Sequence, residues 1–290
     1  MLFDTAVETY WEDKSRRLRG NTLEGYASAI RRHLMPAWAG RELESITHEE
    51  VQRWVDSIES YGAAEKAYKT FRQIYRWSMR RWQLRVWDVT QGVELPERPV
   101  VRRPVLTARE ESETLRGVVG QEWEAVLLCE AALGLRRCEA AGLDWSDFDW
   151  RRGWVHIQRG AHWVAGEVVE YASKTKLSDR WLRVPRWALA RLRQLRGRLR
   201  SGRLRGGLAP HQIAGRFKRL CRRLALPWVP MTCLRHSWAT IALDAGAAIE
   251  DVAVALGHAG VDTCVQHYLQ SFRTVVGRAA DAYEGALMAA

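Results

Sequence analysis

The sequence predicts a mostly α-helical protein of two domains, with a small antiparallel β-sheet in the second domain. Apolar residues recur at helical spacing in the first 95 residues and again after residue 187. A proline-rich segment at 96–106 separates the two parts, and short alternating runs lie between residues 154 and 184. The chain of 290 residues is long enough to bury a real core.

The first domain, residues 1–95, is predicted to be a small helical bundle. Asn21 and Glu24 resemble a capping pair that opens a helix, and Pro36 is expected to end that helix. Thr47 with Glu50 is a second capping box, which predicts another helix start.

A longer helix is predicted at 63–82, with Tyr68, Phe71, Ile74 and Tyr75 on its inward face. Its other side carries six basic residues, Lys66, Lys69, Arg72, Arg76, Arg80 and Arg81. These cations form either an ordinary solvated face or a face that contacts nucleic-acid phosphates. We take Lys66, Lys69, Arg72, Arg76 and Arg80 as DNA-binding candidates.

The segment 96–106 is predicted to be an extended linker, because its prolines come without any periodicity. Thr107 with Glu110 caps the helix that opens the second domain, residues 107–290. A strongly apolar helix is predicted at 123–133 and ends at Gly134. Three strand-like runs follow, at 154–157, 168–171 and 181–184, and residues 174–179 connect the last two of them.

Charge indicates a polyanionic partner. The net charge is +11 and the pI is about 9.8. Residues 181–243 contain many arginines and no Asp or Glu, whereas solvated surfaces usually mix the two signs. The sequence therefore predicts that an anion lies near this arginine-rich block, and Arg favours two-pronged contact with phosphate.

The cysteines and the hydropathy pattern predict a cytoplasmic protein with no membrane partner. The five cysteines form no CxxC pair, which fits reduced thiols. Cys264 and His267 have a ligand-like spacing, but no second pair lies nearby, so we predict no metal and no cofactor. The sequence shows no signal peptide and no apolar run of membrane-spanning length.

One stretch, residues 231–270, carries an unusual set of reactive side chains. Arg235 lies near its start, His258 follows Leu256 and Gly257, and Tyr268 comes ten positions after His258. An arginine, a histidine and a tyrosine in this order suggest a site that holds an anion and offers a phenol to attack it.

This stretch resembles the tyrosine recombinases, the phage-integrase and Xer-type site-specific DNA recombinases. Residues 131–150 resemble the segment that supplies the first catalytic arginine, here Arg136, with Glu139 as the acidic residue that orients the site. Residues 171–185 resemble the β-hairpin that presents the catalytic lysine. Lys174 fits that position best and Lys176 is the alternative.

The resemblance implies a C-shaped two-domain clamp, with a helical core-binding (SAM-like) domain and a catalytic domain that close on double-stranded DNA. It implies DNA cleavage and rejoining through a 3′-phosphotyrosine, without a cofactor, by a homotetramer on a specific recombination site. Arg136 and Arg235 would hold the phosphate, and Tyr268 would be the nucleophile. Lys174 would protonate the leaving oxygen, and His258 would bind the phosphate or orient Tyr268. Lys176 and Arg180 are further DNA-contact candidates.

The sequence departs from the family pattern at two positions. Thr232 stands where the family usually has a histidine, and the adjacent His236 points about 100° away on a helix, so it cannot simply substitute. Many members place the tyrosine nine residues after the histidine, where this chain has His267. Two alternatives therefore remain: a catalytically impaired DNA-binding protein of the same fold, and type IB topoisomerase-like relaxation of DNA. The segment 271–288 either packs on its own core or docks on a neighbouring subunit.

Overall fold

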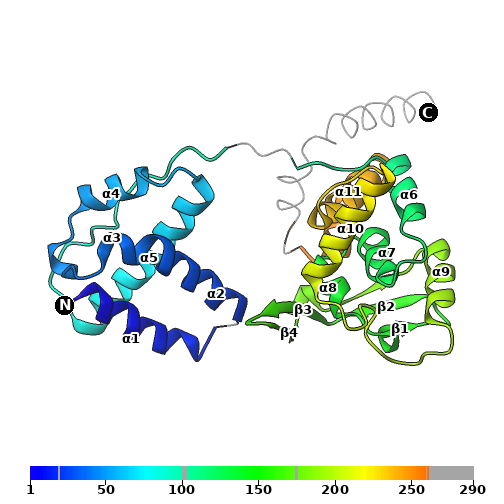
Figure 1. Ribbon diagram of the computed structural model, residues 1–290, viewed down its shortest axis with the longest axis horizontal. Coiled ribbons are helices and arrows are strands. Elements are labelled where there is room, and N and C mark those ends of the chain that lie inside the picture. The colour runs from blue at the N-terminus through cyan, green and yellow to red at the C-terminus, as the bar shows by residue number, and fades with distance from the viewer. Residues whose placement is uncertain (19, 100–102, 174–175, 259, 261–290) are drawn as a thin grey trace, which may run out of the picture. The chain divides into compact units, whose positions relative to one another are not determined.

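The structure, a computed structural model, describes residues 1–258 and Gly260, apart from residues 19, 100–102 and 174–175. The side chains of Asn21 and Lys176 are likewise not described. The chain divides into two compact units, Met1–Val101 and Arg102–Ala290, and the division falls within the segment 96–106 (Figure 1). The predictions at Lys174, Cys264, His267, Tyr268 and 271–288 lie outside the described residues.

The first unit is a helical bundle whose centre is the long helix α5. Phe71, in the middle of α5, contacts the rings of Phe3, Trp38, Trp54 and Tyr75 at centroid distances of 5.3–5.8 Å. These rings come from four helices, so they form one core. The helices are α1 (Phe3–Ser15), α2 (Gly20–Ala29), α3 (Met35–Trp38), α4 (His48–Asp56) and α5 (Tyr61–Trp82).

Two predictions about the start of this bundle are wrong. α2 is described from Gly20, so Asn21 lies inside the helix and not at its N-cap position. Pro36 does not end the helix either, because the chain passes through the π-helical turn Ile30–Leu34 directly into α3. Pro36 occupies the first turn of α3, a position at which a missing amide hydrogen is tolerated.

The predicted helix starts at Thr47 and Thr107 are confirmed. At each position the threonine hydroxyl accepts from the backbone N–H three residues on, and the glutamate at that position accepts from the threonine N–H. The predicted inward residues of α5, Tyr68, Phe71, Ile74 and Tyr75, are buried. Short-range patterns therefore placed these helices correctly.

The second unit is organised around α7 (Glu124–Leu133), in which every residue is buried. α8 (Arg137–Gly142), α9 and α11 pack against it (Figure 1). Gly134, at φ 61°, ends α7 in the left-handed conformation that glycine adopts without strain. The remaining helices are α6 (Ala108–Gly117), α9 (Arg186–Arg196), α10 (Pro210–Leu224), α11 (Met231–Asp244) and α12 (Ile249–Leu256).

The described strands form two small antiparallel sheets in the second unit, not one patch. β2 (Trp154–Ile157) lies between β1 (Phe148–Asp149) and β5 (Arg180–Arg183). β3 (Arg159–Val164) and β4 (Glu167–Ala172) form a separate hairpin. The predicted strand at 168–171 thus pairs with β3, a strand that was not predicted. Its turn residues Ala165 and Gly166 both have positive φ, as a tight hairpin with right-handed twist requires.

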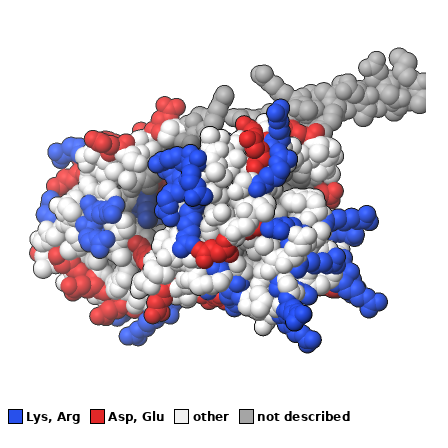
Figure 2. Space-filling view, turned by 45° about the vertical axis from the view of Figure 1, so that its right-hand side comes forward, with Lys and Arg blue, Asp and Glu red and all other residues white. Residues whose placement is uncertain are grey.

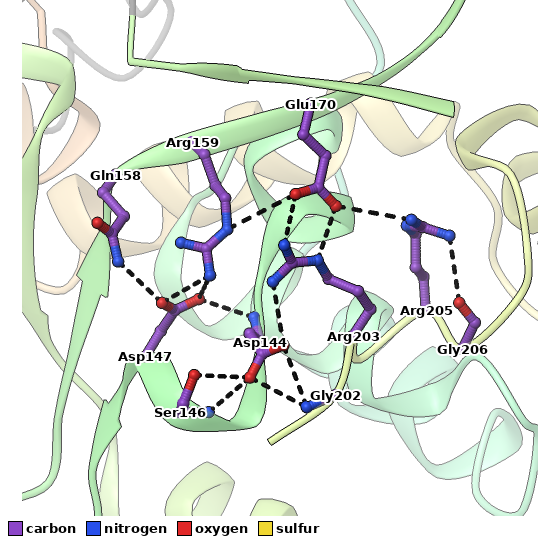
Figure 3. Close-up of polar contacts among 10 residues, drawn as sticks. All are labelled: Asp144, Ser146, Asp147, Gln158, Arg159, Glu170, Gly202, Arg203, Arg205 and Gly206. Carbon is purple, nitrogen blue, oxygen red and sulfur yellow. Dashed lines mark hydrogen bonds and ion pairs between the residues drawn. The ribbon is translucent and has the colours of Figure 1, made fainter. Parts of the chain in front are cut away.

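A network of charged side chains fastens the β3–β4 hairpin to the body of this unit. Glu170 of β4 accepts two hydrogen bonds from Arg203, at 2.7 and 2.5 Å, and Arg203 also donates to Asp144 at 3.0 Å. Arg159 of β3 donates to both oxygens of Asp147 at 2.9 Å. Figure 3 shows Arg203 between Asp144 and Glu170, so this arginine joins the hairpin to the turn before β1.

Candidate active site

The site begins at the junction of α7 and α8. Arg136 is the N-cap residue of α8 and has extended backbone torsions. Its backbone N–H donates to Oε2 of Glu139 at 2.9 Å, and its Nη1 donates to Oε1 at 2.7 Å. The carboxylate thereby satisfies a backbone donor at the helix start and fixes the arginine side chain beside it.

Glu139 is bound by a second arginine, Arg180 of β5. Nη2 of Arg180 lies 3.1 Å from Oε2 of Glu139, and each side chain is 8% exposed. Nη1 of Arg235 lies 3.9 Å from the same oxygen. Burial by itself raises the pKa of Glu139, but the charge and hydrogen bonds of Arg180, followed by those of Arg136, outweigh it and lower the pKa. Glu139 is therefore ionised at neutral pH.

Arg235 joins the ends of two helices. Its Nη1 donates to the carbonyl of Gly134 at 3.0 Å, just past α7, and its Nη2 donates to the carbonyl of Leu256 at 2.6 Å, at the end of α12. Helix C-termini carry partial negative charge, so a buried guanidinium is well placed there. Nη2 also lies 3.0 Å from Nε2 of His258, which accepts because the arginine can only donate.

Gly257 allows the segment after β4 to pass close to α12. Its φ is +64°, and a Cβ at this position would lie 2.8 Å from the carbonyl oxygen of Leu177. Arg180 donates from Nε to the carbonyl of Ala255 at 2.7 Å, which holds the start of β5 against the same helix end. On the other side of residues 174–175, the N–H of Ser173 donates to the carbonyl of Gln158. The residues on both sides of the predicted Lys174 position are thus hydrogen-bonded to the second unit, Ser173 to β2–β3 and Arg180 to the end of α12.

Thr232 and His236 have different surroundings on α11. Thr232 is exposed and lies one helical turn before Arg235. His236 is buried, and its Nε2 lies 2.6 Å from Nη1 of Arg103. His236 therefore faces the segment before α6, as its position next to Arg235 on the helix predicts.

Four of the predicted site residues form one cluster: Arg136, Glu139, Arg235 and His258 are linked by direct contacts. Lys174 and Tyr268 lie outside the described residues. Arg180 was predicted to contact DNA, and this prediction is wrong because the side chain is buried in this cluster. The alternation of inward and outward side chains along the strand could have predicted this burial. Arg180 and Leu182 face inward on β5, while Trp181 and Arg183 face outward.

The basic face predicted on α5 is present. Lys66, Lys69, Arg72 and Arg80 are exposed, whereas Arg76 is partly buried and bound to Asp88 at 2.6 Å. A hollow of about 470 Å³ lies over this face. It is lined by Tyr10, Lys14, Lys69, Arg72, Gln73, Arg76, Trp77 and Arg80.

The arginine-rich block at 181–243, which was predicted to lie near an anion, is partly neutralised by carboxylates of the chain itself. Arg191 binds Glu124, which comes from α7, at 2.6 Å. Arg203 and Arg205 both bind Glu170, and Arg216 pairs with Glu122. The acidic partners precede the block in the sequence. Figure 2 shows Lys and Arg side chains that project mainly from the right-hand side of the view, with a few Asp and Glu between them.

A helical unit with a basic face, followed by a unit in which arginines and a histidine surround one buried carboxylate, has the arrangement of the tyrosine recombinase class. The chain belongs to the phage integrase family. The model described as "Phage integrase family" matches residues 121–274, and the model described as "Phage integrase, N-terminal SAM-like domain" matches residues 2–58. The expected family and the mostly α fold with small antiparallel sheets are thereby confirmed.

Similar proteins agree with this assignment. The chain is 23% identical over 178 residues to "Tyrosine recombinase XerC-like" of Caldanaerobacter subterraneus subsp. tengcongensis, across 51% of this chain and 46% of that protein. The chain therefore aligns with about half the length of this relative. None of the helices within the described ranges is long and apolar enough to cross a membrane.

Two groups of solved structures share the fold. The Tn1549 transposon integrase in complex with transposon right end DNA has a TM-score of 0.77 at 14% identity, over 93% of this chain and 98% of that one. A lambda integrase dimer bound to a COC′ core site has a TM-score of 0.70 at 17% identity, over 92% of this chain and 95% of that one.

Proposed function

We propose that this protein is a site-specific DNA recombinase that cleaves and rejoins DNA strands through a 3′-phosphotyrosine intermediate. The observation that carries the proposal is the contact of Glu139 with Arg136 and Arg180, beside Arg235 and His258. A buried carboxylate that holds several guanidinium groups in place preorganises positive charge. Such charge stabilises the five-coordinate phosphorus of a transesterification.

Arg136 and Arg235 have different parts in this clamp. The side chain of Arg136 is 40% exposed and uses Nη1 to bind Glu139, so its other N–H groups remain available to a phosphate oxygen. Arg235 is almost buried and keeps the ends of α7 and α12 together with His258. Arg235 therefore supplies positive charge from the buried side of the site and fixes the position of His258.

The reaction is a reversible exchange of oxygen atoms at phosphorus. The phenolic oxygen of Tyr268 bonds to the phosphorus and passes its proton to solvent water, while the bond from phosphorus to the 5′-oxygen breaks. Lys174 gives that 5′-oxygen a proton, so a 5′-hydroxyl leaves and the 3′-phosphate stays on the tyrosine. Because the phosphotyrosine ester keeps the bond energy of the phosphodiester, a 5′-hydroxyl can attack it and rejoin the strand without ATP.

Double-stranded DNA is the proposed partner, and the basic face of α5 is its proposed first contact. Charge neutralisation by α5 predicts that affinity falls steeply between ~50 and ~200 mM salt. The protein is proposed to act as a homotetramer on its recombination site. A solved lambda integrase that shares the fold is described as a tetramer bound to a Holliday junction, with a TM-score of 0.68.

The test is single-turnover formation of a covalent protein–DNA adduct on a duplex nicked beside the cut site. The parent protein should form the adduct. Tyr268→Phe should form none and still bind DNA, and Arg136→Ala should lose cleavage by ~10²–10³-fold. Arg136→Lys should restore little, because a point charge cannot make the two-pronged contact.

Three results would contradict the proposal. Tight binding without any adduct from the parent protein would make the chain a DNA-binding protein. Relaxation of supercoiled DNA without strand exchange would indicate a topoisomerase-like activity. An adduct from Tyr268→Phe would show that another residue is the nucleophile.

A further inference from the structure

The amide of Gln73 on α5 is held by two tyrosine hydroxyls from two other helices. The hydroxyl of Tyr10, from α1, lies 3.1 Å from Oε1 of Gln73, and that of Tyr26, from α2, lies 2.6 Å from the same oxygen. The ring of Tyr10 is 2% exposed and packs edge-on against Tyr26 and Trp77, at 6.4 and 5.5 Å. The position of Gln73 is therefore fixed by the core of the first unit.

The distances identify which end of the amide the tyrosines bind. A separation of 2.6 Å is typical of an O–H···O hydrogen bond and short for an N–H···O bond. Burial, followed by the neighbouring Tyr26, raises the pKa of Tyr10, so its hydroxyl keeps its proton and can donate. An amide oxygen has two lone pairs, and these two hydroxyls occupy both of them. What remains is the amide nitrogen with its two hydrogens, so Gln73 can only donate.

The surroundings of this donor suit a nucleic acid. Gln73 is exposed and lines the hollow over the basic face of α5. It also lines a second hollow, next to Lys66 and Gly25. Among the described residues, Arg72 and Arg80 take part in none of the ion pairs, so their charge is available to phosphates. A neutral, oriented donor between such cations adds little to the attraction of phosphate, whereas a base edge is read by groups of this kind.

The dimensions of α5 fit the major groove of duplex DNA. The helix runs from Tyr61 to Trp82, which corresponds to a length of ~33 Å. An α-helix with its side chains is ~10–12 Å wide, close to the ~12 Å width of the major groove. Gln73 lies near the middle of the helix, where a side chain reaches the base edges while residues toward both ends contact phosphates.

We propose that Gln73 is a specificity-determining residue that donates to a base acceptor in the major groove at one position of one strand and rejects cytosine there, because cytosine is the base whose major-groove edge offers no acceptor. The usual pairing of glutamine with adenine needs an amide oxygen to accept from the adenine amino group. Tyr10 and Tyr26 occupy that oxygen, so adenine can accept only at N7 and loses the two-pronged contact. Cytosine offers an amino donor alone and is disfavoured at this position. This inference rests on the proposed binding of duplex DNA.

The test is selection of bound duplexes from a randomised library, followed by affinity measurements on the selected sites. The parent protein should exclude cytosine at one position. Gln73→Met, which keeps the length of the side chain and removes both donors, should lose that preference by ~5–150-fold, the range of one good base contact. The double variant Tyr10→Phe, Tyr26→Phe frees the amide oxygen and should newly prefer adenine there, because the oxygen can then accept from the adenine amino group. Circular dichroism checks that it folds, and Gln194→Met, on an exposed part of α9, is the matched control.

Three outcomes separate the inference from the proposed function. An unchanged preference in Gln73→Met, with DNA binding intact, overturns the inference and leaves the recombinase proposal standing. An equal loss of affinity for every sequence in Gln73→Met shows a phosphate contact and also overturns it. A parent protein that selects no sequence and binds with a flat salt response overturns both proposals.

Discussion

Glu139 and Arg180 form a buried ion pair between the start of α8 and the start of β5, with Oε2 and Nη2 3.1 Å apart. The carboxylate also accepts from the backbone and side chain of Arg136, so a single anion compensates two arginines. Removing one partner of such a pair leaves the other charge buried without compensation. This contact therefore connects the stability of the second unit with the geometry of the proposed clamp.

Glu139→Gln is expected to lower both stability and activity. The variant keeps the shape of the side chain but leaves Arg180 without its counter-charge, which typically costs ~3–5 kcal/mol of unfolding free energy. Urea unfolding measures this cost, and adduct formation on a nicked duplex should slow in parallel because Arg136 is no longer held. Asp149→Asn is the control and should change stability little, because it removes only a 4.0 Å pair with the exposed Arg152 and keeps the oxygen that accepts from the N–H groups of Arg151 and Arg152. Equal stability of the two variants would contradict the prediction.

Gly257→Ala is expected to destabilise the second unit and to slow cleavage. The residue has φ +64°, and its new Cβ would lie 2.8 Å from the carbonyl oxygen of Leu177. The left-handed backbone alone costs an L-residue ~1–2 kcal/mol, and the contact pushes the segment that precedes β5 away from α12. Thermal unfolding and adduct formation measure the two effects.

Gly260→Ala is the matched control for that substitution. A Cβ at Gly260 meets nothing within 4 Å, and the residue lies only three positions along the chain. Its stability should equal that of the parent. A Gly257→Ala protein as stable and as active as Gly260→Ala would show that neither property depends on the close approach of the Leu177 carbonyl to residue 257.

Glu111→Gln is expected to stabilise the protein above neutral pH. Burial raises the pKa of Glu111 from 4.5 to about 7, and its Oε2 is buried without a hydrogen-bond partner among the described residues. Because the folded state binds this proton more tightly than the unfolded state, its contribution is fully present below pH ~4.5. It is lost as the pH rises through about 7.

The measurement is the unfolding free energy of parent and variant from pH 4 to 9. The advantage of Glu111→Gln should grow between pH ~4.5 and ~7 and level off above that, at ~1–3 kcal/mol. Glu113→Gln, exposed on the same helix, should follow the parent at every pH. Parallel curves for the parent and Glu111→Gln would refute the raised pKa.

Thr232→His is expected to maintain or raise the rate of adduct formation and to add a pH dependence near neutrality. Thr232 is exposed one turn before Arg235, so a histidine there has room and a position facing the clamp. An imidazole has an unperturbed pKa of ~6.5, and general acid–base assistance is typically worth ~10²–10⁴ in rate. Thr232→Val removes the hydroxyl and should be slower than the parent. Identical rates for Thr, Val and His would show that the position takes no part in the chemistry.

The sequence by itself determined the features that depend on near neighbours. The capping boxes at Thr47 and Thr107 involve residues three positions apart, so their residue types suffice to predict them. The buried face of α5 follows from the helical period in the same way. The family motifs also supplied Arg136, Glu139, Arg235 and His258, which the fold brings into contact.

Only the tertiary structure decided which charges are neutralised and where. Arg180 lies 41 positions from Glu139, and Arg191 lies 67 positions from Glu124, so no local pattern joins either pair. The same limit applies to the three-stranded sheet, because β2 pairs with β5 and the whole β3–β4 hairpin lies between them in the chain. Charges and strand edges pair with residues that lie beside them in the folded chain. Which distant residues lie beside them is decided by packing and cannot be predicted from neighbours in the sequence.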